Sequence, residues 1–98
     1  MNVRFVAGDD AFLSAYNGGP KVVFSVSDHP SAPWGSVLGN AENLFQQHGG
    51  LPHWGKEHAL TRERAAVLFP DFERFQKIRR ELDPKDLFLN AHLREIFG

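Results

Sequence analysis

The sequence predicts an α+β protein, in which short antiparallel strands near the N-terminus are followed by helices. Apolar and polar residues alternate at residues 3–6 and again at residues 21–27, which is typical of strands with one buried face. From residue 37 onward, apolar residues recur every three or four positions, which indicates amphipathic helices. Because the strands precede the helices and do not alternate with them, an α+β fold is favoured over an α/β fold.

The length and composition of the chain fit one folded domain, residues 1–98. Hydrophobic residues make up 42% of the chain and include nine phenylalanines, so a core is expected. The formal net charge is −1, with acids and bases interspersed, which argues against nucleic acid as a partner. The absence of cysteine excludes disulfides and thiolate metal sites and fits a cytoplasmic location. No apolar run approaches the roughly 20 residues of a spanning helix, so any membrane association would come through a partner or a further segment.

Each predicted strand borders a turn. The first strand, Val3–Val6, is expected to end at Gly8-Asp9-Asp10, and the second, Lys21–Ser27, follows the hairpin turn NGGP. Two strands do not make a stable sheet alone, because their edges and their apolar face need neighbours. The chain is therefore expected to be the end of something larger, and to self-associate through the exposed sheet edge when isolated.

Four helices are predicted, each bounded by capping or helix-breaking residues: 37–48, 61–69, 71–82 and 90–97. Thr61, Asp71 and Asn90 have short polar side chains that can accept hydrogen bonds from the first backbone N–H groups of a helix. The pair Gly49-Gly50 ends the first helix, because glycine readily takes the left-handed conformation found after helix ends.

The stretch GGLPHWGKEH, residues 49–58, places a lysine between a Trp-Gly step and a histidine, in a loop stiffened by a proline. A cation held this way can face an electron-rich ring or a substrate oxygen, so Lys56 is a candidate site residue. The alternative is a loop lysine whose neighbour Trp54 only packs. Arg4, on the polar side of the first strand, is either a fixed fork for substrate oxygens or a solvated strand residue.

A metal site in this stretch is considered and not predicted. His48, His53 and His58 stand five residues apart, which does not align them on one helical face as HExxH does. Pro52 and Gly55 would also break any helix between them.

Four stretches together carry a resemblance to a known family: VRFVAGDDAFLS, GGLPHWGKEH, LFPDFERFQKIRRELDP and FLNAHL, in this order across nearly the whole chain. They resemble the C-terminal end of the sugar-1,4-lactone oxidases, a flavoprotein family that includes L-gulonolactone oxidase and D-arabinono-1,4-lactone oxidase, within the vanillyl-alcohol oxidase superfamily. The resemblance implies that the chain is the C-terminal part of a substrate, or cap, domain. It implies an enzyme that oxidises an aldono-1,4-lactone at C2 by hydride transfer to FAD.

Nothing in the chain resembles the family's FAD-binding domain. The chain alone is therefore expected to bind no FAD and to be inactive. Its expected partners are the FAD-binding domain, in the same or a partner chain, and the sugar lactone.

The resemblance also implies roles for individual residues. Lys56, in the His-Trp-Gly-Lys signature, would lie beside the isoalloxazine ring and the substrate, and Arg4 would line the same pocket. A fixed cation there favours a reaction that leaves negative charge on the flavin. His53 and Trp54 would orient Lys56 on the cofactor side of the site.

Two positions depart from related patterns. Asn2 stands where the family's strand has the acid of Glu-x-Arg before Arg4, and an amide can hydrogen-bond but carries no negative charge. Ser25 aligns with a histidine of the related alditol oxidases, which favours a lactone over a linear polyol as substrate. The alternatives are an alditol oxidase fragment and a stand-alone binding or assembly module that has kept the fold and lost the chemistry, as Asn2 suggests.

Overall fold

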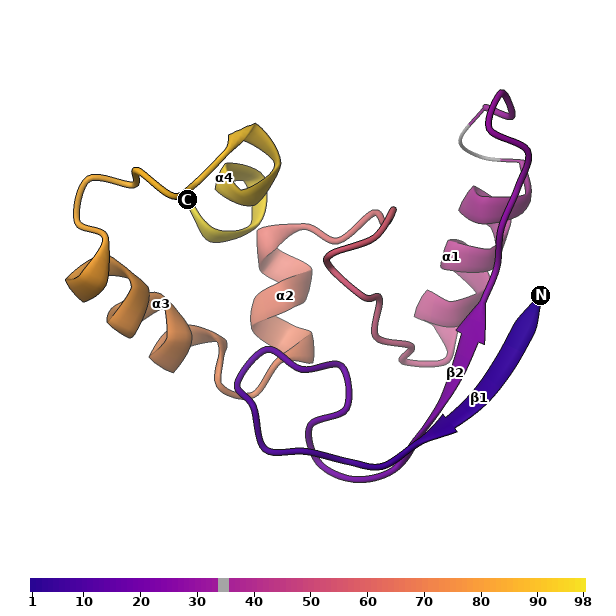
Figure 1. The fold of residues 1–98 in the computed structure, drawn as a ribbon, viewed down its shortest axis with the longest axis horizontal. Coiled ribbons are helices and arrows are strands. Elements are labelled where there is room, and N and C mark those ends of the chain that lie inside the picture. The colour runs from indigo at the N-terminus through magenta and orange to yellow at the C-terminus, as the bar shows by residue number, and fades with distance from the viewer. Residues whose placement is uncertain (34–35) are drawn as a thin grey trace.

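The computed structural model describes residues 1–33 and 36–98 of the chain, which form an antiparallel pair of strands followed by helices (Figure 1). The described elements are β1 Asn2–Val6, β2 Lys21–Ser25, α1 Val37–Gln47, α2 Arg62–Leu68, α3 Phe72–Leu82 and α4 Ala91–Phe97. The predicted α+β class is confirmed, with strands first and helices after. No helix in this part of the chain has the length and apolar composition needed to cross a membrane.

The two strands pair in a register that puts Asn2 opposite Ser25 and Arg4 opposite Val23. β2 is two residues shorter than predicted, because it ends at Ser25 and not at Ser27. The described pairing ends where Asn2, the first residue of β1, lies opposite Ser25.

The apolar face of the strand pair is largely open. Val3 and Phe24 form one cross-strand pair on this face, and Phe5 and Val22 form the next. Phe24 stacks on Phe45 of α1, with 5.6 Å between ring centroids, and Figure 1 shows α1 running beside β2. Phe5 is 84% exposed, so α1 covers only part of the face. A two-stranded sheet in this state is marginal by itself.

Residues 7–20 join the strands, and the predicted NGGP turn, residues 17–20, forms only the last part of this path. The path reaches back to the helices, where it buries Leu13. It is held locally by Asp9, whose carboxylate accepts hydrogen bonds from the Ser14 hydroxyl (2.6 Å) and the Ala11 N–H (3.1 Å). Where the path closes, a Cβ on Gly8 would lie 2.5 Å from the Gly19 backbone, so only glycine fits there.

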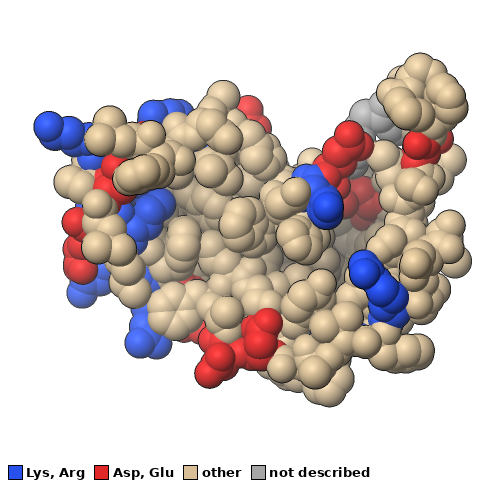
Figure 2. Space-filling model, viewed as in Figure 1, with Lys and Arg blue, Asp and Glu red and all other residues tan. Residues whose placement is uncertain are grey.

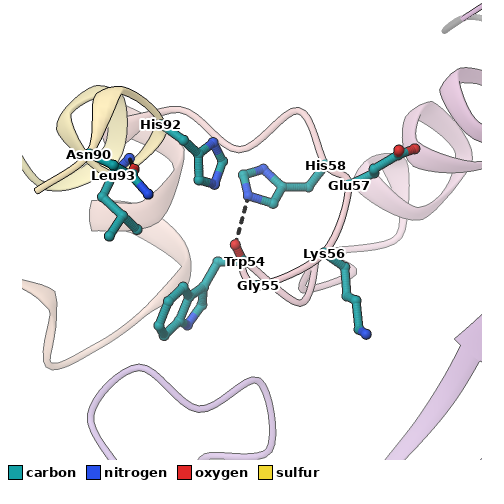
Figure 3. A pocket seen from close by; sticks show the side chains of 8 residues that line it. All are labelled: Trp54, Gly55, Lys56, Glu57, His58, Asn90, His92 and Leu93. Atoms are coloured by element: carbon teal, nitrogen blue, oxygen red, sulfur yellow. Dashed lines mark hydrogen bonds between the residues drawn. The ribbon is translucent and has the colours of Figure 1, made fainter.

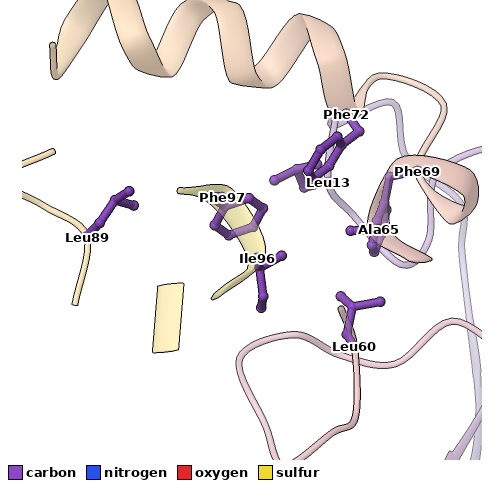
Figure 4. Close-up of a cluster of buried hydrophobic side chains, with 8 residues drawn as sticks. All are labelled: Leu13, Leu60, Ala65, Phe69, Phe72, Leu89, Ile96 and Phe97. Atoms are coloured by element: carbon purple, nitrogen blue, oxygen red, sulfur yellow. The ribbon is translucent and has the colours of Figure 1, made fainter. Parts of the chain in front are cut away.

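The core lies among α2, α3, α4, the segments that precede α2 and α4, and the 7–20 segment between the strands (Figure 4). It consists of Leu13, Leu60, Ala65, Phe69, Phe72, Leu89, Ile96 and Phe97. Phe97 contacts three aromatic rings: Phe75 at 5.2 Å, Trp54 at 5.8 Å and Phe72 at 6.1 Å between centroids. The last helix is therefore tied to α3 and to the loop that contains Trp54.

Two of the three predicted helix caps are confirmed. Thr61 accepts a hydrogen bond from the Arg64 N–H (3.3 Å), and Asn90 accepts one from the Leu93 N–H (2.8 Å). Asp71 precedes α3 as predicted, but its side chain makes no capping bond, so that part of the prediction is wrong. The backbone explains the difference, because Asp71 has ψ 17° and is nearly helical, whereas the two capping residues are extended.

The start of α1 uses a cap from a distant residue. The Asp28 carboxylate accepts hydrogen bonds from the Ser36 hydroxyl (2.7 Å) and from the Val37 N–H (3.2 Å). The bond from Ser36 lowers the pKa of the Asp28 carboxyl. At the other end Gly49 has φ 69° and the Gly50 N–H reaches back into the helix, which confirms the predicted Gly-Gly end.

Replacing a core phenylalanine should cost far more stability than replacing an exposed one. Phe72 is 1% exposed and Phe88 is 82% exposed. The change to alanine therefore leaves a cavity in the core at position 72, whereas at position 88 it removes a side chain that is mostly in contact with solvent. Phe72→Ala should lower the free energy of unfolding by about 3–5 kcal/mol, and Phe88→Ala by less than about 0.5 kcal/mol. Urea unfolding of both variants measures the difference, and equal losses would contradict the assignment of the core.

Candidate functional site

The segment that carries Lys56, residues 53–58, has no regular secondary structure and is held by its own side chains; we refer to it as the Lys56 turn. The Lys56 N–H donates to the His53 carbonyl (2.9 Å), which closes the turn. The Gly55 N–H donates to Nδ1 of the His53 ring (3.1 Å). His53 therefore shapes the backbone beside Lys56, although its side chain is exposed.

Trp54 fixes the Lys56 turn to the rest of the molecule. Its Nε1–H donates to the Leu13 carbonyl (3.0 Å), across 41 positions of sequence. Its ring meets Phe97 edge-on, with an interplanar angle of 90°. These two contacts join the turn to the 7–20 segment on one side and to α4 on the other. Trp54 therefore packs against the rest of the protein, and this packing is compatible with a role in orienting Lys56.

His58 closes the far end of the turn with both ring nitrogens, and Figure 3 shows its bond to the Trp54 carbonyl. Nδ1 accepts a hydrogen bond from the Leu60 N–H (2.9 Å), so it carries no proton. Nε2 must then carry the proton of the neutral ring, and it lies 3.1 Å from the Trp54 carbonyl, to which it donates. Burial of the half-buried ring lowers the pKa of His58 below its ordinary value of 6.5.

The Lys56 side chain is exposed, and in the described part of the chain it makes no ion pair or side-chain hydrogen bond. Figure 3 shows it pointing away from His58 and His92. A rigid backbone thus presents an uncompensated positive charge at the surface. That arrangement can hold an anionic or electron-rich group, but it provides no group placed for proton transfer.

A shallow depression of about 470 Å³ lies between the Lys56 turn and the start of α4. Its lining residues are Trp54, Gly55, Lys56, Glu57, His58, Asn90, His92 and Leu93. The rings of His58 and His92 lie 5.0 Å apart between centroids. In residues 1–33 and 36–98, no group of three or more potential ligands is placed to hold a metal ion.

The other predicted site residues gather on the polar face of the strand pair. Nη2 of Arg4 donates to the Ser25 hydroxyl at 3.4 Å, and Asn2 is the cross-strand partner of Ser25. All three side chains are exposed. In the described structure no hydrogen bond or ion pair joins this group to the Lys56 turn. The structure therefore brings the predicted residues together in two groups and does not join the groups directly.

The sequence analysis missed the structural role of His58, which it considered only as a metal ligand. A signal was available, because the ten residues between Gly50 and Thr61 form no helix or strand and their backbone groups need other partners. A histidine two positions before Leu60 can supply an acceptor for such a loop. Sequence alone does not fix which backbone groups the ring reaches.

Comparison with known proteins places the chain among sugar-lactone oxidoreductases. The sequence profile of the family described as D-arabinono-1,4-lactone oxidase matches residues 1–96. The chain belongs to this family. The resemblance recognised from the sequence is thereby confirmed at the family level.

Individual relatives agree with this assignment. The chain is 34% identical over 98 residues to an L-gulono-1,4-lactone dehydrogenase of Mycobacterium tuberculosis, with 100% of the chain covered. It is 35% identical over 101 residues to an L-gulonolactone oxidase of Scyliorhinus torazame, with 99% covered. It is 29% identical over 97 residues to an alditol oxidase of a Streptomyces species, with 96% covered. In each case the chain spans only 23% of the relative's length.

Removing the indole N–H of Trp54, together with part of its ring, should loosen the Lys56 turn. Trp54→Phe keeps an aromatic ring against Phe97 but leaves the Leu13 carbonyl without its donor. The variant should lose about 1 kcal/mol of unfolding free energy. Lys56→Met, which removes an exposed charge, should stay within about 0.5 kcal/mol of the parent chain. Thermal unfolding of the two variants checks this, and the opposite ranking would show that the turn is anchored elsewhere.

Proposed function

We propose that this chain is the C-terminal part of the substrate domain of an FAD-dependent sugar-1,4-lactone oxidase, which oxidises an aldono-1,4-lactone at C2. The proposal rests on one observation: the family profile matches nearly the whole chain, residues 1–96, but the chain spans only 23% of the length of its relatives. The lactone is preferred to a linear polyol because most of the lactone enzymes are more similar to the chain, at 32–35% identity, than the alditol oxidase at 29%, although a plant L-gulonolactone oxidase is 27% identical.

The geometry of the Lys56 turn supports a place for Lys56 beside the flavin. Its ammonium is exposed and unpaired in the described structure, and the backbone beneath it is held by Trp54 and His58. These properties fit a cation that faces an electron-rich ring system. Bound FAD supplies the hydride acceptor. Lys56 would hold a fixed positive charge where negative charge develops, which lowers the barrier without any proton transfer by this residue.

The polar face of the strand pair would bind the lactone. Arg4 offers several donors in a planar fork, and its contact with Ser25 restrains it. Ser25 can both donate to and accept from sugar hydroxyls. Asn2 would contribute amide hydrogen bonds in place of the family's carboxylate, so this site holds one negative charge fewer than the family pattern.

The open apolar face formed by Val3, Phe5, Val22 and Phe24 supports a larger assembly. In the proposed enzyme this face and the strand edges are covered by further polypeptide, including an FAD-binding domain in the same or a partner chain. In the isolated chain the same surface would promote self-association.

The chain alone should bind no FAD, because it contains none of the domain to which the flavin would be anchored. After expression with excess FAD and removal of unbound flavin, its absorption spectrum should lack the flavin bands. Addition of L-gulono-1,4-lactone should produce no turnover. Stoichiometric FAD on the purified chain would overturn the assignment as a fragment.

In an enzyme that contains this segment and an FAD-binding domain, Lys56→Met should slow flavin reduction by about 10²–10³-fold, as expected for loss of one fixed electrostatic group. Stopped-flow reduction by the lactone measures the step directly. Lys85→Met is the matched control, because Lys85 is an exposed lysine in the segment between α3 and α4 and should leave the rate unchanged. An unaffected rate in the Lys56 variant would reassign Lys56 to the protein surface.

A further inference from the structure

We propose that His58 is the positioning residue of the Lys56 turn: its neutral ring clamps the two ends of the segment that carries Lys56, and protonation of the ring releases the clamp. The clamp itself depends only on contacts within this chain. Its consequence for catalysis rests on the function proposed for Lys56.

The clamp follows from the two groups that the ring joins. Nε2–H donates to the carbonyl of Trp54, two residues before Lys56, and Nδ1 accepts from the N–H of Leu60, four residues after it. One side chain thus ties together both flanks of a segment that lacks helix or strand bonds. Leu60 is buried and Trp54 is anchored to Leu13 and Phe97, so both ends of the clamp are fixed to the body of the protein.

The clamp requires the neutral ring. A second proton on His58 would have to occupy Nδ1, which then becomes a donor facing the Leu60 N–H, another donor. That hydrogen bond would be lost, and the two N–H groups would repel each other. The Trp54 carbonyl bond, made by Nε2–H, survives protonation. Protonation of His58 therefore breaks the bond to Leu60 and keeps the bond to Trp54.

The surroundings of the ring act on its pKa in both directions, and the lowering effects prevail. Desolvation, the largest effect, disfavours the imidazolium, and so do His92 on α4 and Arg64 on α2, whereas the hydrogen bond to the Trp54 carbonyl favours it. Glu42 on α1 also favours it, although its carboxylate is shared with Arg64 at 3.2 Å. Within the turn itself, Lys56 and Glu57 are exposed and of opposite charge.

The direction of the pH effect follows from these facts. A base whose pKa is lowered in the folded protein stays neutral near neutral pH, so the clamp is closed there. As the pH falls through the lowered pKa, the ring takes up a proton, the Leu60 bond opens and the Lys56 turn loosens. The unfolded chain binds this proton at a higher pH, so folding stability also falls as the pH drops below 6.5.

Three variants separate a clamp from a ring that merely fills space. His58→Asn places an amide oxygen near the position of Nδ1, so it keeps an acceptor for the Leu60 N–H and cannot titrate. His58→Phe fills the space and makes neither bond. His92→Asn removes the neighbouring exposed ring and leaves both His58 bonds in place.

The test is amide hydrogen exchange by NMR on the 98-residue chain, expressed as protection relative to an unstructured peptide at the same pH. Protection of the Leu60 and Lys56 amides should fall about five- to tenfold between about pH 7 and about pH 5 in the parent chain and in His92→Asn. It should be independent of pH in His58→Asn and low throughout in His58→Phe. Unchanged protection in the parent chain, or a proton on Nδ1 of His58 near neutral pH, would overturn the proposal.

A second arm uses an enzyme that contains this segment and an FAD-binding domain. Flavin reduction should lose rate at acidic pH with the parent segment, and His58→Asn should abolish this acidic limb. An acidic limb of the same size and midpoint in His58→Asn would refute the catalytic consequence of the clamp. If Lys56→Met leaves flavin reduction unchanged while the exchange result holds, the clamp is real and the function proposed for Lys56 is what fails.

Discussion

The contact that the rest of the structure depends on is the docking of Trp54. Its indole N–H holds the Leu13 carbonyl and its ring meets Phe97, so one side chain joins the 7–20 segment, the Lys56 turn and the last helix. The ten residues before Thr61 form neither helix nor strand, so their position depends on side-chain contacts, of which the Trp54 contacts reach the 7–20 segment and α4. A lysine on a mobile loop is a poor electrostatic catalyst, since its charge must be in place before the reaction begins.

The candidate site residues lie in two parts of the molecule, one well packed and the other not. Figure 2 shows the surface indented between the strand–α1 side and the helical side. Lys56 lies on the loop between α1 and α2, supported by the core, whereas Arg4, Asn2 and Ser25 lie on a two-stranded sheet whose apolar face is mostly exposed. A substrate pocket that used both groups would need further polypeptide to hold the strands in place. This division agrees with a chain that spans 23% of its relatives.

Sequence patterns predicted what depends on local chemistry. The helices, the Thr61 and Asn90 caps and the Gly-Gly end of α1 follow from periodicity and from side chains that act within one turn. The Asp71 cap failed for a local reason, its backbone conformation. The other differences depend on residues distant in the sequence: the pairing of β2 ends at Ser25, opposite Asn2, and the start of α1 is capped by Asp28, eight residues before Ser36. The two hydrogen bonds of the His58 ring depend on where Trp54 is anchored, and residue spacing in the sequence does not predict that position. The functional assignment came from the family's motifs. The structure then showed which contacts hold the backbone beside Lys56.

The proposed function requires that the ammonium of Lys56 be held toward a reacting flavin and substrate. The most direct measurement is a crystal structure of a complete enzyme that contains this segment, with FAD and a sugar lactone bound. We expect Nζ of Lys56 and the guanidinium of Arg4 to line one substrate pocket, with Nζ beside the isoalloxazine ring. A structure in which Nζ of Lys56 extends into bulk solvent, away from the flavin, would contradict it.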